Sequence, residues 1–319
     1  MKVLANDGIS QSGIKALEKG GFEVITTKVA QEQLINFINE NNVDVILVRS
    51  ATTVRKDMID ACPSLKIIGR GGVGMDNIDV DYAREKGLHV INTPAASSSS
   101  VAELVFAHLF SGVRFLHDAN RNMPLDGDSK FKDLKKSYAK GTELRGKTIG
   151  IIGFGRIGRE VAKIALGCGM KVIASDKFVG EADITLDFYD GQQVTLKIKT
   201  EPVDELIQHS DFITLHVPAQ KEYIIGKAQI AKMKDGAAII NAARGGVIDE
   251  VALVEALDTK KLSFAGLDTF EEEPTPAIKV LMNGNISLSP HIGAATNEAQ
   301  DRIGTELATQ IIDILKPVS

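Results

Sequence analysis

The chain has 319 residues, and its 37 Lys and Arg against 42 Asp and Glu give a net charge of −5. This length suffices for two domains with separate cores, and the slight acidic excess argues against nucleic acid or an anionic membrane as a partner. No apolar run approaches the roughly 20 residues of a membrane span, and residues 1–7 lead into a strand rather than a signal peptide, so we expect a cytoplasmic protein.

The first ninety residues alternate short apolar runs with amphipathic stretches. Predicted strands cover 3–5, 22–25, 45–48, 65–68 and 88–91, and helical patterns cover 13–19 and 34–38. Strands that alternate with helices are typical of a parallel sheet covered on both faces. The two cysteines, Cys62 and Cys168, show no metal-ligand spacing, so we expect small packed thiols and no metal site.

A domain boundary is indicated near residue 94 by Thr93-Pro94 and by four successive serines, residues 97–100. Ser100 and Glu103 fit a capping box, which predicts a helix from Ser100 through Val113 rather than a flexible linker. The polar, lysine-rich segment 121–140 is interpreted as a solvated surface.

A second series of alternating strands and helices follows. Strands are predicted at 149–152, 171–174, 212–215, 237–240, 264–267 and 286–288. Residues 183–198 break this rhythm, because two alternating runs flank Asp190-Gly191, a strong turn signal that predicts a β-hairpin. Apolar residues at every fourth position from Ile303 to Leu315 predict a final helix, which we expect to dock on the first unit.

The run from Gly153 to Gly158 carries the most specific local motif. Gly153, Gly155 and Gly158 form the pattern G-x-G-x-x-G between a strand and a helix, the context of a dinucleotide-binding turn. In that order, the glycines permit a tight turn, let the backbone approach a pyrophosphate, and allow close packing of helix on strand. The start of the helix, at Arg156 and Ile157, supplies N–H groups and a positive dipole end to the phosphates.

Asp176 ends the next predicted strand, roughly 20 residues past the first glycine, where a ribose-binding acid is expected. We expect its carboxylate to hydrogen-bond ribose hydroxyls and to repel a 2′-phosphate. The predicted cofactor is therefore NAD, and Lys177 leaves NADP open as the alternative.

Three polar residues follow other predicted strands of the second series. Arg244 follows 238–240, Glu273 closes a triple glutamate after the strand at 264–267, and His291 follows 286–288. Open α/β sheets bind ligands at the carboxyl ends of their strands. Singly, these residues fit a surface ion pair, a solvated loop and a non-catalytic histidine. Together they suggest a carboxylate clamp, an orienting acid and a proton-transferring base.

Several longer segments are similar to one family. They are residues 49–52, 69–77, 141–148, 241–249 and 288–296. The chain resembles the D-2-hydroxyacid dehydrogenase family over essentially its whole length, and within it the members that act on D-3-phosphoglycerate. The resemblance implies an α/β fold of two doubly wound parallel-sheet domains. A Rossmann-type NAD-binding domain, residues 95–294, would be inserted in a flavodoxin-like substrate-binding domain, residues 1–94 plus 295–319.

The resemblance also implies roles for the three polar residues. Arg244 would grip the substrate carboxylate and polarise the C2 oxygen, His291 would exchange the proton on that oxygen, and Glu273 would orient His291. The chemistry of these side chains agrees, because a guanidinium offers two parallel donors to a carboxylate and a histidine exchanges protons near neutral pH. The partner is then a small 2-hydroxy or 2-keto acid, and the protein would be a homodimer or a higher homo-oligomer.

By the same resemblance, the backbone N–H groups of Val73 and Gly74 would hold the substrate carboxylate. Arg49, with Arg70 as second choice, would face a substrate phosphate. Ser97 stands where asparagine is common near the substrate, so the identity of the 2-hydroxy acid stays open. The hairpin is unusual for the family. The chain also lacks the regulatory domain of longer relatives, so we expect no serine feedback through such a domain.

The expected activity is the NAD-dependent oxidation of D-3-phosphoglycerate to 3-phosphohydroxypyruvate in serine biosynthesis. A glycerate or hydroxypyruvate reductase is the alternative enzyme, with the same three residues and no phosphate site. A corepressor that binds NAD and recognises partners with this fold is the alternative from another class. A third class, enzymes that bind an adenosyl ligand, can share the glycine turn. Membership of that class would not explain the presence of Arg244, Glu273 and His291 in this order.

Overall fold

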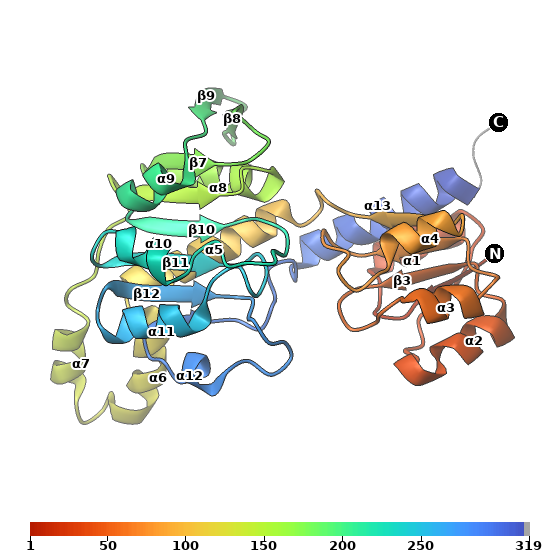
Figure 1. Ribbon diagram of the computed structural model, residues 1–319, viewed down its shortest axis with the longest axis horizontal. Coiled ribbons are helices and arrows are strands. Elements are labelled where there is room, and N and C mark those ends of the chain that lie inside the picture. Colours follow the sequence, from red (N-terminus) through yellow and green to blue (C-terminus); the bar gives the residue numbers. More distant parts are fainter. Residues whose placement is uncertain (316–319) are drawn as a thin grey trace. The chain divides into compact units, whose positions relative to one another are not determined.

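The computed structural model describes residues 1–315, which fold into two compact units. Unit 1 comprises Met1–Ser100 and the chain from Ala294 onward, and unit 2 comprises Val101–Gly293. The sequence placed these boundaries after residues 94 and 294. Each unit is a parallel sheet with helices on both faces, so the predicted α/β class is confirmed (Figure 1).

Unit 1 is built on a five-stranded parallel sheet. Its order is β2 (Glu23–Ile25), β1 (Lys2–Ala5), β3 (Val45–Val48), β4 (Ile67–Arg70) and β5 (His89–Asn92). This order, 2-1-3-4-5, is that of flavodoxin-like folds. The connecting helices are α1 (Gln11–Lys19), α2 (Leu34–Asn41), α3 (Lys56–Ala61) and α4 (Val80–Glu85), with a short 3₁₀ turn, η1 (Gln31–Gln33).

Alternating side chains of these strands feed two separate cores. Leu4 and Ile46 face the core made with α2, α3 and α4, whereas Val3 and Leu47 face the core made with α1 and α13 (Asn297–Leu315). This division follows from the period of two in a strand. Because the strands are buried on both faces of the sheet, their sequences are continuous apolar runs rather than alternating ones.

The last helix, α13, docks on unit 1 as the sequence predicted, and there it packs on α1. Ile303, Leu307 and Ile311 are buried in the core that α1 shares. The two helices cross where Gly13 meets Gly304, and a Cβ on Gly13 would lie 2.8 Å from the Gly304 Cα. Both glycines are therefore needed for the close approach of the two helices.

Unit 2 is built on a six-stranded parallel sheet. Its order is β13 (Ile286–Leu288), β12 (Leu262–Leu267), β11 (Ala237–Asn241), β10 (Phe212–Leu215), β6 (Thr148–Ile152) and β7 (Lys171–Ser175). One face is covered by α5 (Ser98–Val113) and α8 (Arg156–Gly167). The other is covered by α9 (Val203–His209), α10 (Lys227–Lys232), α11 (Glu250–Asp258) and α12 (Ile278–Leu281).

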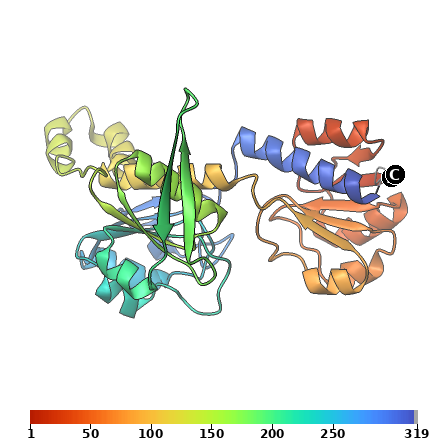
Figure 2. The ribbon, with the colours of Figure 1, turned by 90° about the horizontal axis from the view of Figure 1, so that it is seen from above.

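The predicted hairpin is present. Strands β8 (Glu181–Asp187) and β9 (Gln193–Lys199) pair in antiparallel fashion, and Gly191 takes a φ of 84° in the turn. The hairpin is only partly covered: Ile184 is 1% exposed, whereas its cross-strand partner Leu196 and Phe188, near the turn, are exposed. Figure 2 shows the hairpin extending beyond the sheet of unit 2.

The predicted start of the helix after residue 96 needs correction. Helix α5 begins at Ser98 rather than at Ser100, because the Ser98 N–H already turns back to the Ala95 carbonyl. Ser100 lies inside the first turn, and its hydroxyl contacts Thr296 Oγ1 at 2.8 Å instead of capping the helix. The polar segment 121–140 is exposed as expected, but most of it folds into α6 (Leu116–Asp126) and α7 (Phe131–Ser137).

Both cysteines are packed thiols, as predicted. Cys62 is buried, which raises the pKa of its thiol to about 11, and Cys168 is half-buried. Within residues 1–315 there is no cluster of three or more side chains suited to a metal ion. No single helix of the same residues is long and apolar enough to cross a membrane. The bent pair α5 and α6 has the length and composition of a membrane span only when the two helices are taken together.

Candidate active site

The carboxyl ends of all six parallel strands of unit 2 lie along one edge of its sheet. The chain leaves β6 toward β7 on one side and returns to β10 on the other side, so the strand order reverses between β6 and β10. Such a reversal opens the crevice in which α/β sheets bind their ligands. The loops after β6, β7, β11, β12 and β13 carry the residues that the sequence predicted to bind NAD or to act in catalysis.

The glycine loop after β6 has the geometry that a dinucleotide needs. Gly153 has a φ of 94°, and a Cβ there would collide with the carbonyl of His216 after β10. A Cβ on Gly158 would collide with the Gly153 carbonyl, so this glycine permits the close packing of α8 on the loop. Gly155 faces open space, which a side chain would fill. The positions of the three glycines therefore fit the three tasks that the motif assigns to them.

Helix α8 presents its amino end beside this open space. Arg156, its first residue, is exposed, and Ile157 is half-buried. The N-cap residue is Gly155, which has no side chain to accept a hydrogen bond from the first turn. The amino end of the helix and the empty cradle at Gly155 fit the pyrophosphate of NAD.

Asp176 ties the end of β7 to the glycine loop. Its Oδ2 accepts the Phe154 N–H at 2.7 Å, and its Oδ1 accepts the N–H groups of Phe178 and Val179 at 2.8 and 3.0 Å. Partial burial opposes ionisation, but these three donors and the nearby Arg159 outweigh it and lower the pKa of Asp176. The carboxylate is thus charged and prearranged, and Oδ2, which accepts only one of these hydrogen bonds, has a lone pair left for a ribose hydroxyl.

Arg244 lies in a loop that the side chain of Asn241, the last residue of β11, holds at two points. Asn241 Oδ1 accepts the Ala243 N–H at 3.1 Å, and its Nδ2 donates to the Arg244 carbonyl at 2.8 Å. One guanidinium nitrogen of Arg244, Nη1, donates to the Ala243 carbonyl at 2.7 Å. The half-buried guanidinium is therefore held in place at the sheet edge.

His291 and Glu273 form a direct pair. His291 Nδ1 lies 2.8 Å from Glu273 Oε2, and the other oxygen, Oε1, accepts the Phe270 N–H at 3.1 Å. A carboxylate only accepts, so Nδ1 carries a proton and Nε2 is the nitrogen with a lone pair that can accept one. The side chains are 41% and 36% exposed, so a ligand can reach them. The structure therefore brings together two residues that lie 18 positions apart in the sequence.

The triple glutamate has three separate environments. Glu273 contacts His291, and Glu272 is exposed without a hydrogen bond to another described residue. Glu271 Oε1 accepts the Glu250 N–H at 2.9 Å, and Glu250 Oε1 accepts the Glu271 N–H at 2.8 Å. Burial and the charges of the three glutamates raise the pKa of Glu250, although the Glu271 N–H opposes the shift. One glutamate thus serves the histidine and another anchors the loop to α11.

Two polar residues at this edge escaped the sequence analysis. Asp268 follows β12 and accepts the N–H groups of Ile292 and Gly293, each at 2.8 Å, on either side of its carboxylate. His216 follows β10, and burial lowers the pKa of its imidazole to about 3, so it stays neutral. Both follow predicted strands, which was the available signal, but neither belongs to a recognisable motif.

In unit 1, the two predicted phosphate-binding arginines lie at the ends of neighbouring strands. Arg49 follows β3, and Arg70 ends β4, where it is the register partner of Val48. The Arg49 main chain is fixed by Asp7, whose Oδ2 accepts its N–H at 2.6 Å. The guanidinium of Arg70 packs over Gly72, which a side chain at Gly72 would prevent. The structure thus brings both arginines to one edge of this sheet.

The loop after β4 presents two backbone donors at the same edge. The N–H groups of Val73 and Gly74 donate to no acceptor within the described residues. Asn92 steadies the loop by donating its Nδ2 to the Val73 carbonyl at 2.7 Å. Adjacent free N–H groups of this kind suit a carboxylate. Ser97 is buried, directly before α5.

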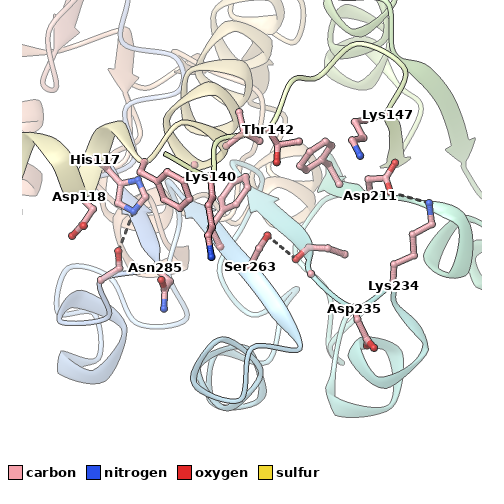
Figure 3. A pocket seen from close by; sticks show the side chains of 18 residues that line it. His117, Asp118, Lys140, Thr142, Lys147, Asp211, Lys234, Asp235, Ser263 and Asn285 are labelled. Atoms are coloured by element: carbon pink, nitrogen blue, oxygen red, sulfur yellow. Dashed lines mark hydrogen bonds and ion pairs between the residues drawn. The ribbon is translucent and has the colours of Figure 1, made fainter. Parts of the chain in front are cut away.

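A cavity of about 310 Å³ lies at the opposite edge of the unit 2 sheet (Figure 3). Its lining includes Lys147, Asp211 and Ala237, which mark the amino ends of β6, β10 and β11. Asp211 Oδ1 and Lys234 Nζ form an ion pair there at 2.9 Å. None of the predicted site residues lines this cavity.

Comparisons with known proteins agree with the site in unit 2. A family model described as "D-isomer specific 2-hydroxyacid dehydrogenase, NAD binding domain" matches residues 106–293. The chain is 45% identical over 316 residues to a hydroxypyruvate reductase of Thermotoga maritima, and the match covers 97% of both chains. It is 42% identical over 318 residues to a D-3-phosphoglycerate dehydrogenase of Methanocaldococcus jannaschii, covering 99% of this chain but only 58% of that relative.

A solved structure shares the whole fold. A glyoxylate reductase from Paecilomyes thermophila is 29% identical, with a TM-score of 0.81 over 99% of this chain and 95% of its own. The family model spans more than half of the chain and includes the glycine loop, Asp176, Arg244, Glu273 and His291. The chain belongs to the D-isomer specific 2-hydroxyacid dehydrogenases, as an NAD-binding member of that family.

Proposed function

We propose that this dehydrogenase interconverts D-3-phosphoglycerate and 3-phosphohydroxypyruvate, as a step of serine biosynthesis. The observation that carries the proposal is the pair Arg49 and Arg70 at neighbouring strand ends of unit 1. The described residues give the Arg49 side chain no ion pair, and a phosphate is a natural counter-ion for a guanidinium. The proposal also draws support from relatives that carry the name D-3-phosphoglycerate dehydrogenase.

In this proposal, three side chains of unit 2 perform the proton and charge work. When NAD is bound, it supplies the acceptor for the hydride that leaves C2. Arg244 holds the substrate carboxylate and polarises the C2 oxygen. His291 Nε2 takes the proton of the C2 hydroxyl during oxidation and returns it during reduction. Glu273 stabilises the imidazolium that forms, because its Oε2 lies 2.8 Å from Nδ1.

The cofactor and the remaining contacts belong to the same proposal. Asp176 favours NAD over NADP, because its charged carboxylate faces the position of a 2′-phosphate. The free N–H groups of Val73 and Gly74 hold the substrate carboxylate, and Ser97 lines the substrate side. We also propose a cytoplasmic homodimer, since the exposed Leu125 and Phe131 of α6 and α7 would be buried by a second copy.

Hydroxypyruvate reduction is the second candidate. The Thermotoga maritima relative of that name matches this chain over 97% of both lengths. The two candidates share the chemistry at C2 and differ only in the substrate phosphate. Their separation therefore depends on the arginines of unit 1.

The test compares 3-phosphohydroxypyruvate and hydroxypyruvate as substrates for NADH oxidation. Arg49→Ala is expected to lower kcat/KM for the phosphorylated acid by about 10- to 100-fold, the equivalent of one charge-assisted hydrogen bond of roughly 1.5–3 kcal/mol. The same substitution should change kcat/KM for hydroxypyruvate by no more than about twofold, because that acid has no phosphate. Arg55→Ala is the matched control, because Arg55 pairs with Asp79 at 3.0 Å on the surface of the same unit. Equal losses on both acids would assign Arg49 a structural role and remove the support for a phosphorylated substrate.

A further inference from the structure

A buried histidine of α5 bridges two serines at the end of β13. His108 is 4% exposed, and its Nδ1 and Nε2 lie 2.9 Å from the hydroxyls of Ser287 and Ser289, respectively. Gly266 of β12 makes room for the ring, since a Cβ there would lie 2.7 Å from the His108 Cβ. The proposed reaction assigns no role to this histidine.

The hydrogen bonds around Ser289 determine which ring nitrogen carries the proton. Ser289 donates its single hydroxyl proton to Asp268 Oδ1 at 2.6 Å. It can therefore only accept from His108, so Nε2 is the protonated nitrogen. Burial, reinforced by His117 and opposed by Asp268, lowers the pKa of His108 and keeps the ring neutral. Nδ1 is then an acceptor, and the Ser287 hydroxyl donates to it.

The result is a directed chain of hydrogen bonds that ends at the loop of His291. From Asp268, Oδ1 accepts the Ile292 N–H, Oδ2 accepts the Gly293 N–H, and the main-chain carbonyl accepts the His291 N–H, each at 2.8 Å. His291 itself has a φ of 54°, a left-handed conformation that a non-glycine residue keeps only where its surroundings enforce it. The bonds to Asp268 supply that enforcement on both sides of the residue.

We propose that His108 is a positioning residue for the proton-transferring histidine. It directs the Ser289 hydroxyl to Asp268, and Asp268 then holds the turn that aims His291 Nε2 away from Glu273. The inference rests on the proposed role of His291, but it concerns the hydrogen bonds of Asp268 to Ser289, Ile292 and Gly293 that hold the loop. It goes beyond the proposed function because it assigns a task to a buried side chain of α5.

Three substitutions separate this task from simple packing. His108→Gln places an amide donor near the position of Nε2 and keeps the bond to Ser289. His108→Asn places its amide near Nδ1 and keeps only the bond to Ser287, and His108→Leu keeps neither. We expect kcat for NADH-dependent ketoacid reduction to fall about tenfold in the Asn and Leu variants and to stay within about twofold in the Gln variant. KM for NADH stays unchanged in all three.

A second measurement reads the loop without turnover. Amide hydrogen exchange at Ile292 and Gly293 is expected to accelerate at least tenfold in His108→Asn and to stay near wild type in His108→Gln. Ser289→Ala breaks the chain one bond later and should match His108→Asn in both measurements. It leaves the ring of His108 and its packing on Gly266 in place, so it tests the chain even if the Leu variant fails to fold.

The inference is overturned if His108→Gln and His108→Asn lose kcat equally, because packing rather than the bond to Ser289 would then matter. It is also overturned if exchange at Ile292 and Gly293 is unchanged in Ser289→Ala. His291→Ala separates this failure from that of the proposed function. If that variant keeps its turnover, the role of His291 is wrong. If His291→Ala is inactive while the three His108 variants keep the wild-type kcat, only the positioning role is wrong.

Discussion

The pair of Glu273 and His291 gives the most direct test of the catalytic proposal. Both carboxylate oxygens of Glu273 accept a hydrogen bond, Oε1 from the Phe270 N–H and Oε2 from His291 Nδ1. Glu273→Gln has only one oxygen for these two donors. If that oxygen stays on Phe270, the new amide faces Nδ1 and favours the ring with its proton on Nε2. His291 then lacks the free lone pair that takes the proton of the C2 hydroxyl during oxidation.

The magnitude follows from the distance and the exposure of the pair. Two unit charges about 4 Å apart interact by about 1 kcal/mol in water and about 4 kcal/mol at an effective dielectric constant of 20. The side chains are 41% and 36% exposed, which favours the lower half of that range. We therefore expect kcat for oxidation to fall about 10- to 30-fold, the equivalent of about 1.4–2 kcal/mol.

The assay measures kcat for hydroxyacid oxidation at saturating NAD, with NADH binding followed separately by fluorescence. Glu272→Gln is the matched control, because it removes the same charge one residue away and Glu272 is exposed. NADH affinity should be equal in both variants and in wild type. If Glu273→Gln oxidises its substrate as fast as Glu272→Gln does, Glu273 does not support proton transfer at His291.

Three further outcomes are expected. Asp176→Ala should lower kcat/KM for NAD and raise the ratio of kcat/KM for NADP to that for NAD, because the charge that would repel a 2′-phosphate is lost. Glu250→Gln should raise Tm on the order of 2 °C at alkaline pH. Burial raises the pKa of Glu250, so its carboxyl stabilises the fold below the ordinary pKa of 4.5, where it is protonated. This contribution is lost as the pH rises through the pKa of the folded state, and glutamine cannot ionise. Replacing residues 183–198 by a short glycine link should change the oligomeric state or NAD affinity, because a second copy or the cofactor would bury the exposed apolar side chains of the hairpin.

Each of these has a result that contradicts it. A wild-type preference for NADP would remove the assigned role of Asp176. A Tm difference for Glu250→Gln that is as large at pH 4.5 as in alkali would mean that ionisation is not the cause. Unchanged sedimentation together with unchanged KM for NAD would leave the hairpin without a role in assembly or cofactor binding.

The sequence alone determined the elements whose signals are local. Continuous apolar runs marked the strands of both parallel sheets, and the three glycines after β6 marked the dinucleotide turn, because each depends on a few adjacent residues. The hairpin around Asp190-Gly191 was also predicted correctly, since its turn and its alternating faces lie within 16 residues, 183–198. The start of α5 was misplaced because one turn of serines offers several cap positions and tertiary contacts choose among them.

Only the tertiary structure decided how the loop of His291 is held. Asp268, Ser289 and His108 are far apart or unremarkable in the sequence, and no spacing rule joins a residue of α5 to two serines about 180 positions later. The division of labour within the triple glutamate likewise depended on which neighbour each carboxylate met. Hydrogen bonds between side chains require matched donors and acceptors within about 3 Å, and that proximity is created by the packing of helices on the sheet rather than by any local preference of the chain.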